Sequence, residues 1–203
     1  MNNILNKASY YVIEQFENKF PKGITYHDLS HTTEAVQAAK IIGENSGINA
    51  AQFEILLLAA WFHDIGYKED YKDHEERSAK ISREFLTEHN YPSDSVDMIT
   101  RIILSTKLPH KPANLLEEIM CDSDICYIGK KEFYMRSQVL RVEWKNMLGK
   151  KFSDLEWIRM NIDFLTKNKF HTKYAKSLYD DHRKENLAKL QKKIRKGMNK
   201  VPT

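Results

Sequence analysis

The sequence predicts an all-α fold, and three observations support this fold class. Apolar residues recur at intervals of three and four along most of the chain, which is the period of an amphipathic helix. The 203 residues include only 7 Gly and 5 Pro, whereas strand-rich folds need frequent turns. No segment of any length alternates apolar and polar residues as a half-buried strand does. We therefore expect a bundle of helices.

The first two predicted helices occupy the N-terminal part of the chain. Residues 2–20 carry an apolar stripe at helical spacing, and the stripe ends before Pro21, which cannot continue a helix. A second helix is expected to begin at Thr25 or Ser30, since both residue types cap helices. It closes in the glycine-containing segment 43–47.

The third predicted helix is the most apolar segment of the chain. Asn49 is followed three residues later by Gln52, which is the pattern of a capping box. This pair predicts a helix over residues 49–66. Because the segment is apolar on all sides, we expect it to be the central buried helix.

The remaining predicted helices continue to the C-terminus. Asp73 with Glu76, and Ser153 with Glu156, have the spacing of helix caps. Together with the apolar period they predict helices over residues 73–88, 93–106, 113–128, 131–147, 153–167 and 171–195.

No composition shift or linker divides the chain, so we expect a single domain over residues 1–203. The formal net charge is +4, and its excess lies in residues 183–200, within a basic C-terminal helix that starts at about residue 171. The stretch KLQKKIRKGMNK lacks the interleaved aromatic residues that stack on bases. We interpret it as a solvated helix face and do not favour nucleic acid as a partner.

The sequence also predicts a cytoplasmic protein without a membrane partner. The N-terminal residues lack the uninterrupted apolar region of a signal peptide. No apolar run approaches the roughly 20 residues that span a bilayer. Cys121 and Cys126 lie close together in one segment, and we expect both to be reduced thiols that fill small spaces in the core.

The stretch AAWFHDIGYKED places a histidine and an aspartate at the end of an apolar run. Burial of an unpaired polar group costs roughly 2–7 kcal/mol, and burial of a charge costs more. Neighbouring residues on a helix point about 100° apart, so His63 and Asp64 can occupy adjacent positions around one divalent cation. A hydrogen-bonded core pair without metal is the alternative for this doublet taken alone.

A metal at the doublet needs ligands from other helices. The candidates are His31, with His27 one turn earlier in YHDLSH, and either Asp122 or Asp124 in CDSDICYIG. Two histidines and two aspartates form a mixed nitrogen and oxygen site. Such a site suits Mn, Fe, Co, Ni, Mg or Zn better than the thiolate set of a structural zinc site does.

This order of residues resembles the H…HD…D signature of the HD superfamily of metal-dependent phosphohydrolases. The matching positions are His31, the doublet His63-Asp64 and Asp124. YHDLSHTTEAV and LLLAAWFHDIGY are similar to the opening and the core of the family pattern. HEERSA, IILSTKLPH and CDSDICYIG follow in the expected order. RVEW and the segment beginning FHTKY resemble short bacterial members, so the resemblance extends from about residue 24 onward.

The resemblance implies an HD-type helical bundle in which His31, His63, Asp64 and Asp124 hold one divalent metal ion. It also implies hydrolysis of a phosphate ester by a metal-activated water, which Asp64 would orient or deprotonate. The expected partner is a small phosphorylated substrate, with a nucleotide as the first candidate. A second metal is less expected, because single histidines stand where two-metal members often have more.

Further residues surround this expected centre. By the resemblance, His74 and His110 complete a second site in two-metal members, and in single-metal members they contact substrate or donate protons. We place them, with Lys68, near the leaving or bridging oxygens. The cations that could bind phosphate oxygens are Lys68, Arg77, Lys107 and Lys111.

Several residues have a structural alternative. Asp124 matches the final ligand of the family better than Asp122, which could pair with a surface lysine instead. His27 could support His31 or mark the start of a helix. Trp144 and Trp157 recur at helical spacing, and we expect both to be core residues.

Two other functions are compatible with the same doublet. A di-iron oxygenase of the HD type requires a second metal, so the metal-to-protein ratio distinguishes it. A non-catalytic sensor would bind a nucleotide without hydrolysing it. The resemblance also leaves a homodimer open.

Overall fold

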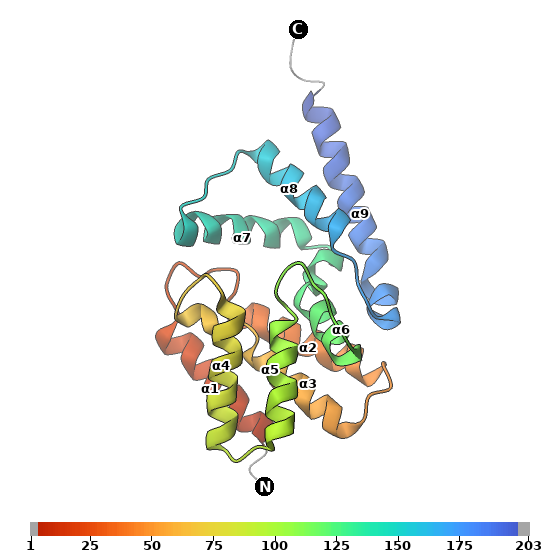
Figure 1. The fold of residues 1–203 in the computed structure, drawn as a ribbon. Coiled ribbons are helices and arrows are strands. Elements are labelled where there is room, and N and C mark those ends of the chain that lie inside the picture. Colours follow the sequence, from red (N-terminus) through yellow and green to blue (C-terminus); the bar gives the residue numbers. More distant parts are fainter. Residues whose placement is uncertain (1–3, 199–203) are drawn as a thin grey trace.

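The computed structural model describes residues 4–198, and helices dominate it (Figure 1). The α-helices are α1 (Ile4–Lys19), α2 (Leu29–Glu44), α3 (Ala50–Phe62), α4 (His74–Glu88), α5 (Ser93–Leu104), α6 (Leu115–Asp124), α7 (Phe133–Leu148), α8 (Asp154–Lys167) and α9 (Lys173–Met198). Two short 3₁₀ helices, η1 (Ile65–Lys68) and η2 (Cys126–Gly129), follow α3 and α6. Residues 4–198 contain no strand, so the predicted all-α fold is confirmed. The first residues of the predicted helix 2–20 and the last of the basic tail lie outside the described range.

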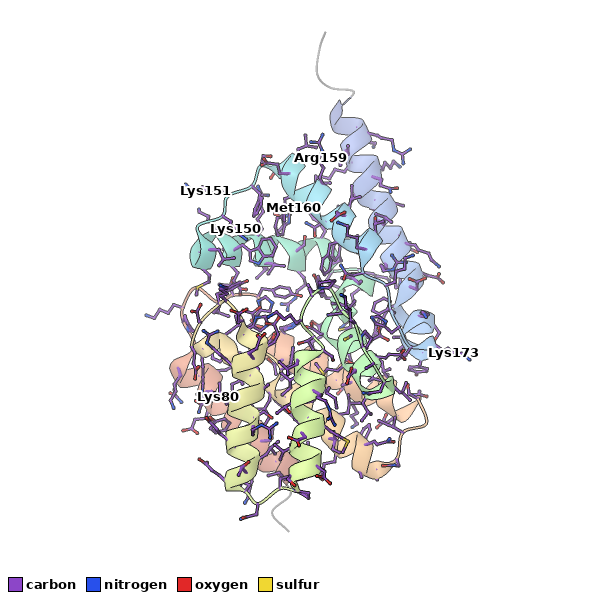
Figure 2. The ribbon with its side chains drawn as sticks, viewed as in Figure 1. Lys80, Lys150, Lys151, Arg159, Met160 and Lys173 are labelled. Atoms are coloured by element: carbon purple, nitrogen blue, oxygen red, sulfur yellow. The ribbon has the colours of Figure 1, made fainter. Side chains whose placement is uncertain are left out.

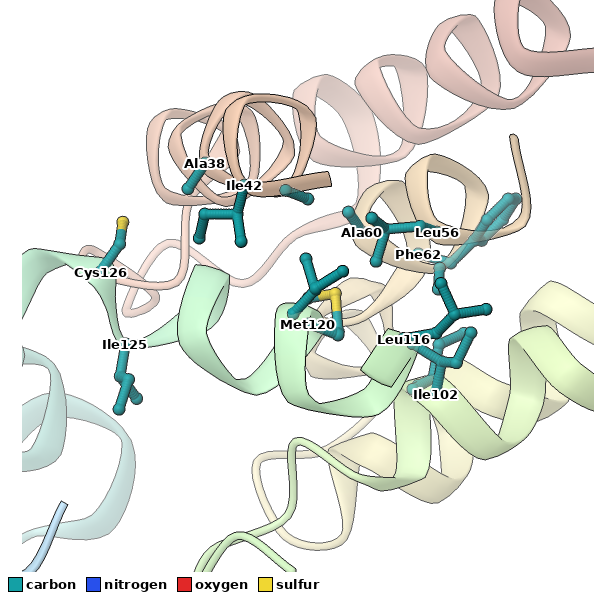
Figure 3. Close-up of a cluster of buried hydrophobic side chains, with 14 of the residues drawn as sticks. Ala38, Ile42, Leu56, Ala60, Phe62, Ile102, Leu116, Met120, Ile125 and Cys126 are labelled. Carbon is teal, nitrogen blue, oxygen red and sulfur yellow. The ribbon is translucent and has the colours of Figure 1, made fainter. Parts of the chain in front are cut away.

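The main core lies where α3 meets α2, α5 and α6. Figure 3 shows Ile42 of α2, Leu56 and Phe62 of α3 and Met120 of α6 in this core, all with no exposed surface. Burial of a side chain of this size contributes about 1.5–3 kcal/mol. The core therefore fixes α3 and α6 side by side, and these helices carry three of the candidate ligands at their C-terminal ends.

Helix α2 is capped by a residue that was not among the predicted caps. Asp28 is its N-cap, and the Asp28 side chain accepts a hydrogen bond from the backbone N–H of His31 at 2.9 Å. The prediction of Thr25 or Ser30 as the first residue is therefore wrong. A carboxylate at this position accepts a hydrogen bond from a free amide of the first turn. Its negative charge also interacts favourably with the positive end of the helix dipole.

The predicted caps of three other helices have different outcomes. Capping boxes form at Asn49 and Ser153, as predicted. Asp73 precedes α4 but adopts a left-handed backbone with φ of 52° and makes no side-chain cap bond. Its carboxylate and that of Glu76 instead accept hydrogen bonds from Lys107, at 3.3 and 2.5 Å. The helix predicted to start at Asp73 and end at Glu88 is confirmed, but Asp73 makes no side-chain cap bond and accepts from Lys107 instead.

Two predicted helices are each divided in the structure. The segment 49–66 forms α3 and then η1, and the segment 113–128 forms α6 and then η2. Each 3₁₀ turn contains a glycine that allows a close approach. A Cβ on Gly66 would lie 2.1 Å from the carbonyl oxygen of His74, and one on Gly129 would lie 2.3 Å from Tyr179 Cβ. The glycines therefore let α4 and α9 pack directly on the two turns.

Helices α7, α8 and α9 lie together on one side of α1–α6 (Figure 1). Helix α7 crosses above the loops of the α1–α6 group, and α9 packs on α8 and η2. Figure 2 shows Lys150, Lys151 and Arg159 at the outer edge of this second group, where all three are exposed. The helices of the described part of the chain are too short or too polar to cross a bilayer.

Candidate metal centre and adjoining cavity

Four side chains from three helices converge beside the buried end of α3. His31 lies in the first turn of α2, His63 and Asp64 follow α3, and Asp124 is the last residue of α6. One ligand atom from each residue lies within 4.8 Å of the other three. The chain segments that supply them are distant in sequence, so the core packing of α2, α3 and α6 creates the cluster.

The short distances within the cluster run between imidazole nitrogens and carboxylate oxygens. His31 Nε2 lies 3.2 Å from Asp124 Oδ1 and 3.3 Å from Asp64 Oδ2. His63 Nε2 lies 3.3 Å from Asp64 Oδ2 and 3.5 Å from Asp124 Oδ1. Two imidazole nitrogens and two carboxylate oxygens thus face a common point.

The donor atoms of His63 and Asp64 suit a cation. His63 Nδ1–H donates a hydrogen bond to the carbonyl oxygen of Ala60 at 2.8 Å, which leaves a lone pair on Nε2. His63 Nε2 and Asp64 Oδ2 are both buried, and neither has a hydrogen-bond partner among the described residues. Buried polar atoms normally have partners, so this pair requires one that the chain does not supply. A divalent cation satisfies both atoms at once.

The electrostatics of the cluster also favour positive charge. Burial alone would lower the pKa of His31, but the hydrogen bond to Asp124 and the nearby carboxylate of Asp64 raise it to about 10. The imidazoles in turn hold the pKa of Asp64 and of Asp124 below the usual range, against the effect of burial. A metal ion that binds here would therefore displace protons.

Helix dipoles add to this field. The C-terminal ends of α3 and α6, which carry partial negative charge, both point to the cluster. His31 stands at the opposite, positive end of α2. The two carboxylates thus lie at the helix ends that favour a cation, and an imidazole rather than a carboxylate lies at the end that does not.

Asp122 has a different role from Asp124. It is fully buried, and its carboxylate accepts hydrogen bonds from the backbone N–H of His171 at 2.6 Å and from the N–H and hydroxyl of Thr172, both at 2.8 Å. It therefore secures the segment that leads into α9. The structure brings Asp124 into the four-residue cluster and excludes Asp122, whose predicted pairing with a surface lysine is wrong.

Comparison with known protein families matches residues 28–128 to the HD domain. This range begins at the cap of α2, ends in η2 and contains all four residues of the cluster. The chain belongs to the HD domain family. It is also 32% identical over 110 residues to an uncharacterized protein of Clostridium beijerinckii, a match that covers 51% of this chain and 68% of that protein. No solved structure matches the chain.

The two other histidines predicted in the HD site, His74 and His110, lie in different surroundings from each other. His74 Nε2 lies 3.6 Å from Asp64 Oδ1, the oxygen that faces away from the cluster, and its ring stacks on Tyr67 with centroids 3.8 Å apart. Burial lowers the pKa of His74 to about 4, so it is neutral at pH 7. His110 Nε2–H donates to the carbonyl oxygen of Thr106 at 3.1 Å. Neither histidine belongs to the four-residue cluster.

The four predicted phosphate-binding cations lie elsewhere. Lys68 donates to Gln15, Lys107 to Asp73 and Glu76, and Arg77 to the carbonyl oxygens of Lys72 and Asp73, while Lys111 is exposed. None of them lines the cavity beside the metal cluster. Their closeness in sequence to the HD doublet and to His110 does not bring them to the site, because carboxylate and carbonyl oxygens elsewhere hold three of them.

A cavity of about 310 Å³ adjoins the cluster. It lies between the HD domain and the helices α7 and α8, and it is mainly aromatic and aliphatic. Its lining residues are Tyr26, His27, His31, Tyr67, Tyr71, Leu108, Asp124, Ile125, Tyr127, Leu140, Trp144, Leu148, Trp157, Met160, Asn161 and Phe164. Trp144 and Trp157, expected to be core residues only, thus form part of its wall.

A buried glutamate of α7 holds the loops at the mouth of the HD site. Glu143 Oε2 accepts the backbone N–H groups of Thr25, Tyr26 and His27 at 2.7, 2.6 and 3.0 Å. Its other oxygen accepts hydrogen bonds from His27 Nδ1–H and, at 2.9 Å, from the Tyr71 hydroxyl. This role was not predicted from the sequence. The only signal was the position of Glu143 between Val142 and Trp144 in RVEW.

Proposed function

We propose that this HD protein is a metal-dependent phosphohydrolase that acts on a phosphate ester of a small molecule, with a nucleotide as the first candidate. One observation carries the proposal. The unpartnered His63 Nε2 and Asp64 Oδ2 are buried beside His31 and Asp124, at the end of a cavity of about 310 Å³. A phosphate ester can reach this end of the cavity while its organic part occupies the remainder.

The residues that would hold the ion are His31, His63, Asp64 and Asp124. When bound, a divalent cation supplies a Lewis acid for the phosphoryl group and lowers the pKa of water. The mixed donor set is compatible with Mn, Fe, Co, Ni, Mg or Zn. We assign a single ion, because the group of residues that could hold a metal contains these four and neither His74 nor His110.

The remaining groups of the site would orient water and transfer protons. Asp64 Oδ1 faces His74 Nε2 at 3.6 Å, so one carboxylate contributes Oδ2 to the metal cluster and presents Oδ1 to His74 on its far side. His74 is neutral at pH 7, since burial depresses its pKa. A neutral imidazole can accept a proton at one nitrogen while it donates from the other. We therefore assign Asp64 to orientation of the attacking water and His74 to proton transfer.

The test is an assay of the metal-loaded protein against a panel of nucleotides and phosphomonoesters. We expect phosphate release, and loss of it in Asp64→Ala without loss of the helical fold measured by circular dichroism. Asp70→Ala is the matched control, because Asp70 is an exposed aspartate on the loop that follows η1. Absence of turnover on the whole panel would contradict the proposal. Nucleotide binding without turnover would indicate a sensor.

We also propose that the reaction takes place in the cytoplasm. Cys121 and Cys126 are both free and buried, which is compatible with a reducing compartment. Burial raises the pKa of each thiol to about 12, so both are unreactive.

A further inference from the structure

The wall of the cavity opposite the metal cluster comes from α7 and α8, outside the range that matches the HD domain. Helix α7 contributes Leu140, Trp144 and Leu148, each four residues apart. Helix α8 contributes Trp157, Met160, Asn161 and Phe164, at spacings of three and four. Each helix thus presents a single face to the cavity. The space is therefore shaped by a part of the chain that the family match does not cover.

The cavity contains no cation away from the metal cluster. Within the described chain no lysine or arginine lines it, and the titratable side chains on its surface are His27, His31, Asp124 and four tyrosines. Figure 2 shows the nearest labelled cations of the α7–α8 group, Lys150, Lys151 and Arg159, on its outer edge, whereas Met160 lies between the two helices. Lys150 Nζ lies 5.4 Å from the ring centroid of Trp144, and the Arg136 guanidinium lies 4.8 Å from that of Tyr26, but neither cation is a lining residue. A chain of several phosphates would therefore find no counter-charge on the cavity wall itself. One phosphate at the metal end and an uncharged group elsewhere match this lining.

Two residues of the α8 wall, Trp157 and Asn161, carry polar groups. Trp157 is 2% exposed, and its indole N–H has no hydrogen-bond partner among the described residues. Asn161, one turn later, is 7% exposed and donates from Nδ2 to the carbonyl oxygen of Trp157 at 2.7 Å. That bond occupies an amide donor and leaves Oδ1 as the acceptor of the side chain. A buried donor without a partner requires an explanation, and a ligand acceptor supplies one.

We propose that Trp157 and Asn161 recognise the organic part of the substrate as a flat, uncharged ring. Trp157 Nε1–H would donate to a ring acceptor, and Asn161 Oδ1 would accept from a ring or exocyclic N–H. Nucleobases carry both kinds of group on one edge, and their faces suit aromatic walls. The substrate class is then a nucleoside monophosphate rather than a polyphosphate. This inference rests on the proposed function for the position of the phosphate.

Calorimetric titration of metal-depleted protein with adenosine tests the recognition without any reaction. We expect saturable binding. Trp157→Phe keeps a large aromatic ring but removes the N–H, and it should weaken binding on the order of tenfold. The matched control is Trp61→Phe, because Trp61 packs against the main core and does not line the cavity. We expect its affinity for adenosine to equal that of the unchanged protein.

A second variant and a second ligand pair complete the test. Asn161→Leu should weaken adenosine binding as Trp157→Phe does, and circular dichroism confirms that each variant is folded. In the metal-loaded protein, AMP should bind at least as tightly as ATP. Equal adenosine affinity in Trp157→Phe, Asn161→Leu and the unchanged protein would overturn the inference, as would tighter binding of ATP.

The two proposals fail in different ways. Hydrolysis of simple esters such as glycerol phosphate, with no binding of adenosine, would keep the phosphohydrolase and reject base recognition. Binding of adenosine that depends on Trp157, with no hydrolysis of any ester, would keep the recognition wall and reject the reaction.

Discussion

Two aspartates separated by one residue in α6 have opposite surroundings. Residues two apart on a helix point about 200° apart, so Asp122 and Asp124 face different sides. Asp124 faces His31 and His63, whereas Asp122 holds the two backbone amides before α9. The residue type alone does not distinguish a metal ligand from a structural hydrogen-bond acceptor. The two aspartates are distinguished by the partners that each side chain reaches.

This difference predicts the behaviour of Asp122→Asn. The variant replaces an acceptor oxygen by an NH₂ group that faces N–H donors, so we expect it to lower the free energy of unfolding by about 1–3 kcal/mol. Urea denaturation measures the loss. Metal affinity, measured by calorimetric titration, should stay within twofold of the unchanged protein. A large loss of metal affinity with unchanged stability would reverse the roles assigned here.

Glu143 is the residue on which the loops beside the cavity depend. Burial acts to raise its pKa, but the hydrogen bond and charge of His27 and the backbone amides lower the pKa to about 2. A carboxylate with a depressed pKa stabilises the fold above its ordinary value of 4.5, and this contribution is lost as the pH falls towards 2. At neutral pH the contribution is on the order of 3 kcal/mol.

We therefore predict that Glu143→Gln destabilises the protein by about 2–4 kcal/mol at pH 7, because the charge that holds these donors is lost. The difference between the two proteins should shrink as the pH falls from 4.5 to about 2. Chemical denaturation at several pH values measures it. Glu156→Gln is a useful comparison, since Glu156 is an exposed capping residue of α8. A pH-independent difference for Glu143→Gln would contradict this account.

At the scale of elements, the two candidate aspartate ligands, Asp64 and Asp124, lie in the same kind of local structure. An α-helix ends near an aspartate, a 3₁₀ turn follows, and the glycine of that turn packs against a later helix. Gly66 lies two residues after Asp64, and Gly129 lies five after Asp124. Each turn thus anchors a ligand-bearing helix end to a second helix, α4 or α9.

Gly66→Ala should separate η1 from α4, because the added methyl would meet backbone atoms of His74 and Ser78, which cannot rotate away. We expect a loss of about 1–3 kcal/mol in the free energy of unfolding and weaker metal binding. Gly23→Ala is the matched control. A methyl there meets chiefly the flexible end of Met147, so its effect should be smaller. Thermal unfolding of both variants compares them, and equal losses would contradict the role given to the turn.

The sequence predicted the helices well where caps and apolar periods agree, as at Asn49 and Ser153. It did not predict the 3₁₀ turns. Ile65 and Ile125 continue the apolar pattern across each break, and that pattern does not separate α from 3₁₀ backbone. The start of α2 was missed because three capping residue types lie within six positions, and only the fold decides which one reaches a free amide.

At the scale of the molecule, the cavity exists because α7 and α8 cover the metal face of the HD domain. The four cluster residues were predicted from their order in the sequence, and the structure brings them together. The wall was not predicted. A tryptophan at helical spacing gives the same pattern whether it fills a core or lines a cavity, and Trp157 is as buried as core residues are. A single sequence likewise does not show that Glu143 pairs with the distant residues 25–27.

The metal should stabilise the whole fold, since its ligands come from three helices. At a metal concentration of 100 times the Kd, the expected gain is about 2.7 kcal/mol, or about 5–10 °C in Tm for a chain of this size. Thermal scans with Mn²⁺ and after chelation measure the shift. His89→Ala is the control, because His89 does not belong to the cluster. This variant should show the same shift in Tm as the unchanged protein.

The most direct test is the number of metal ions per chain, measured by elemental analysis after dialysis against Mn²⁺ in the unchanged protein, Asp124→Asn and Asp122→Asn. We predict one ion in the unchanged protein and in Asp122→Asn, and far less than one in Asp124→Asn. Two irons in freshly purified protein would favour the oxygenase. No bound metal in the unchanged protein, or full occupancy in Asp124→Asn, would contradict the claim that this cluster holds a single cation.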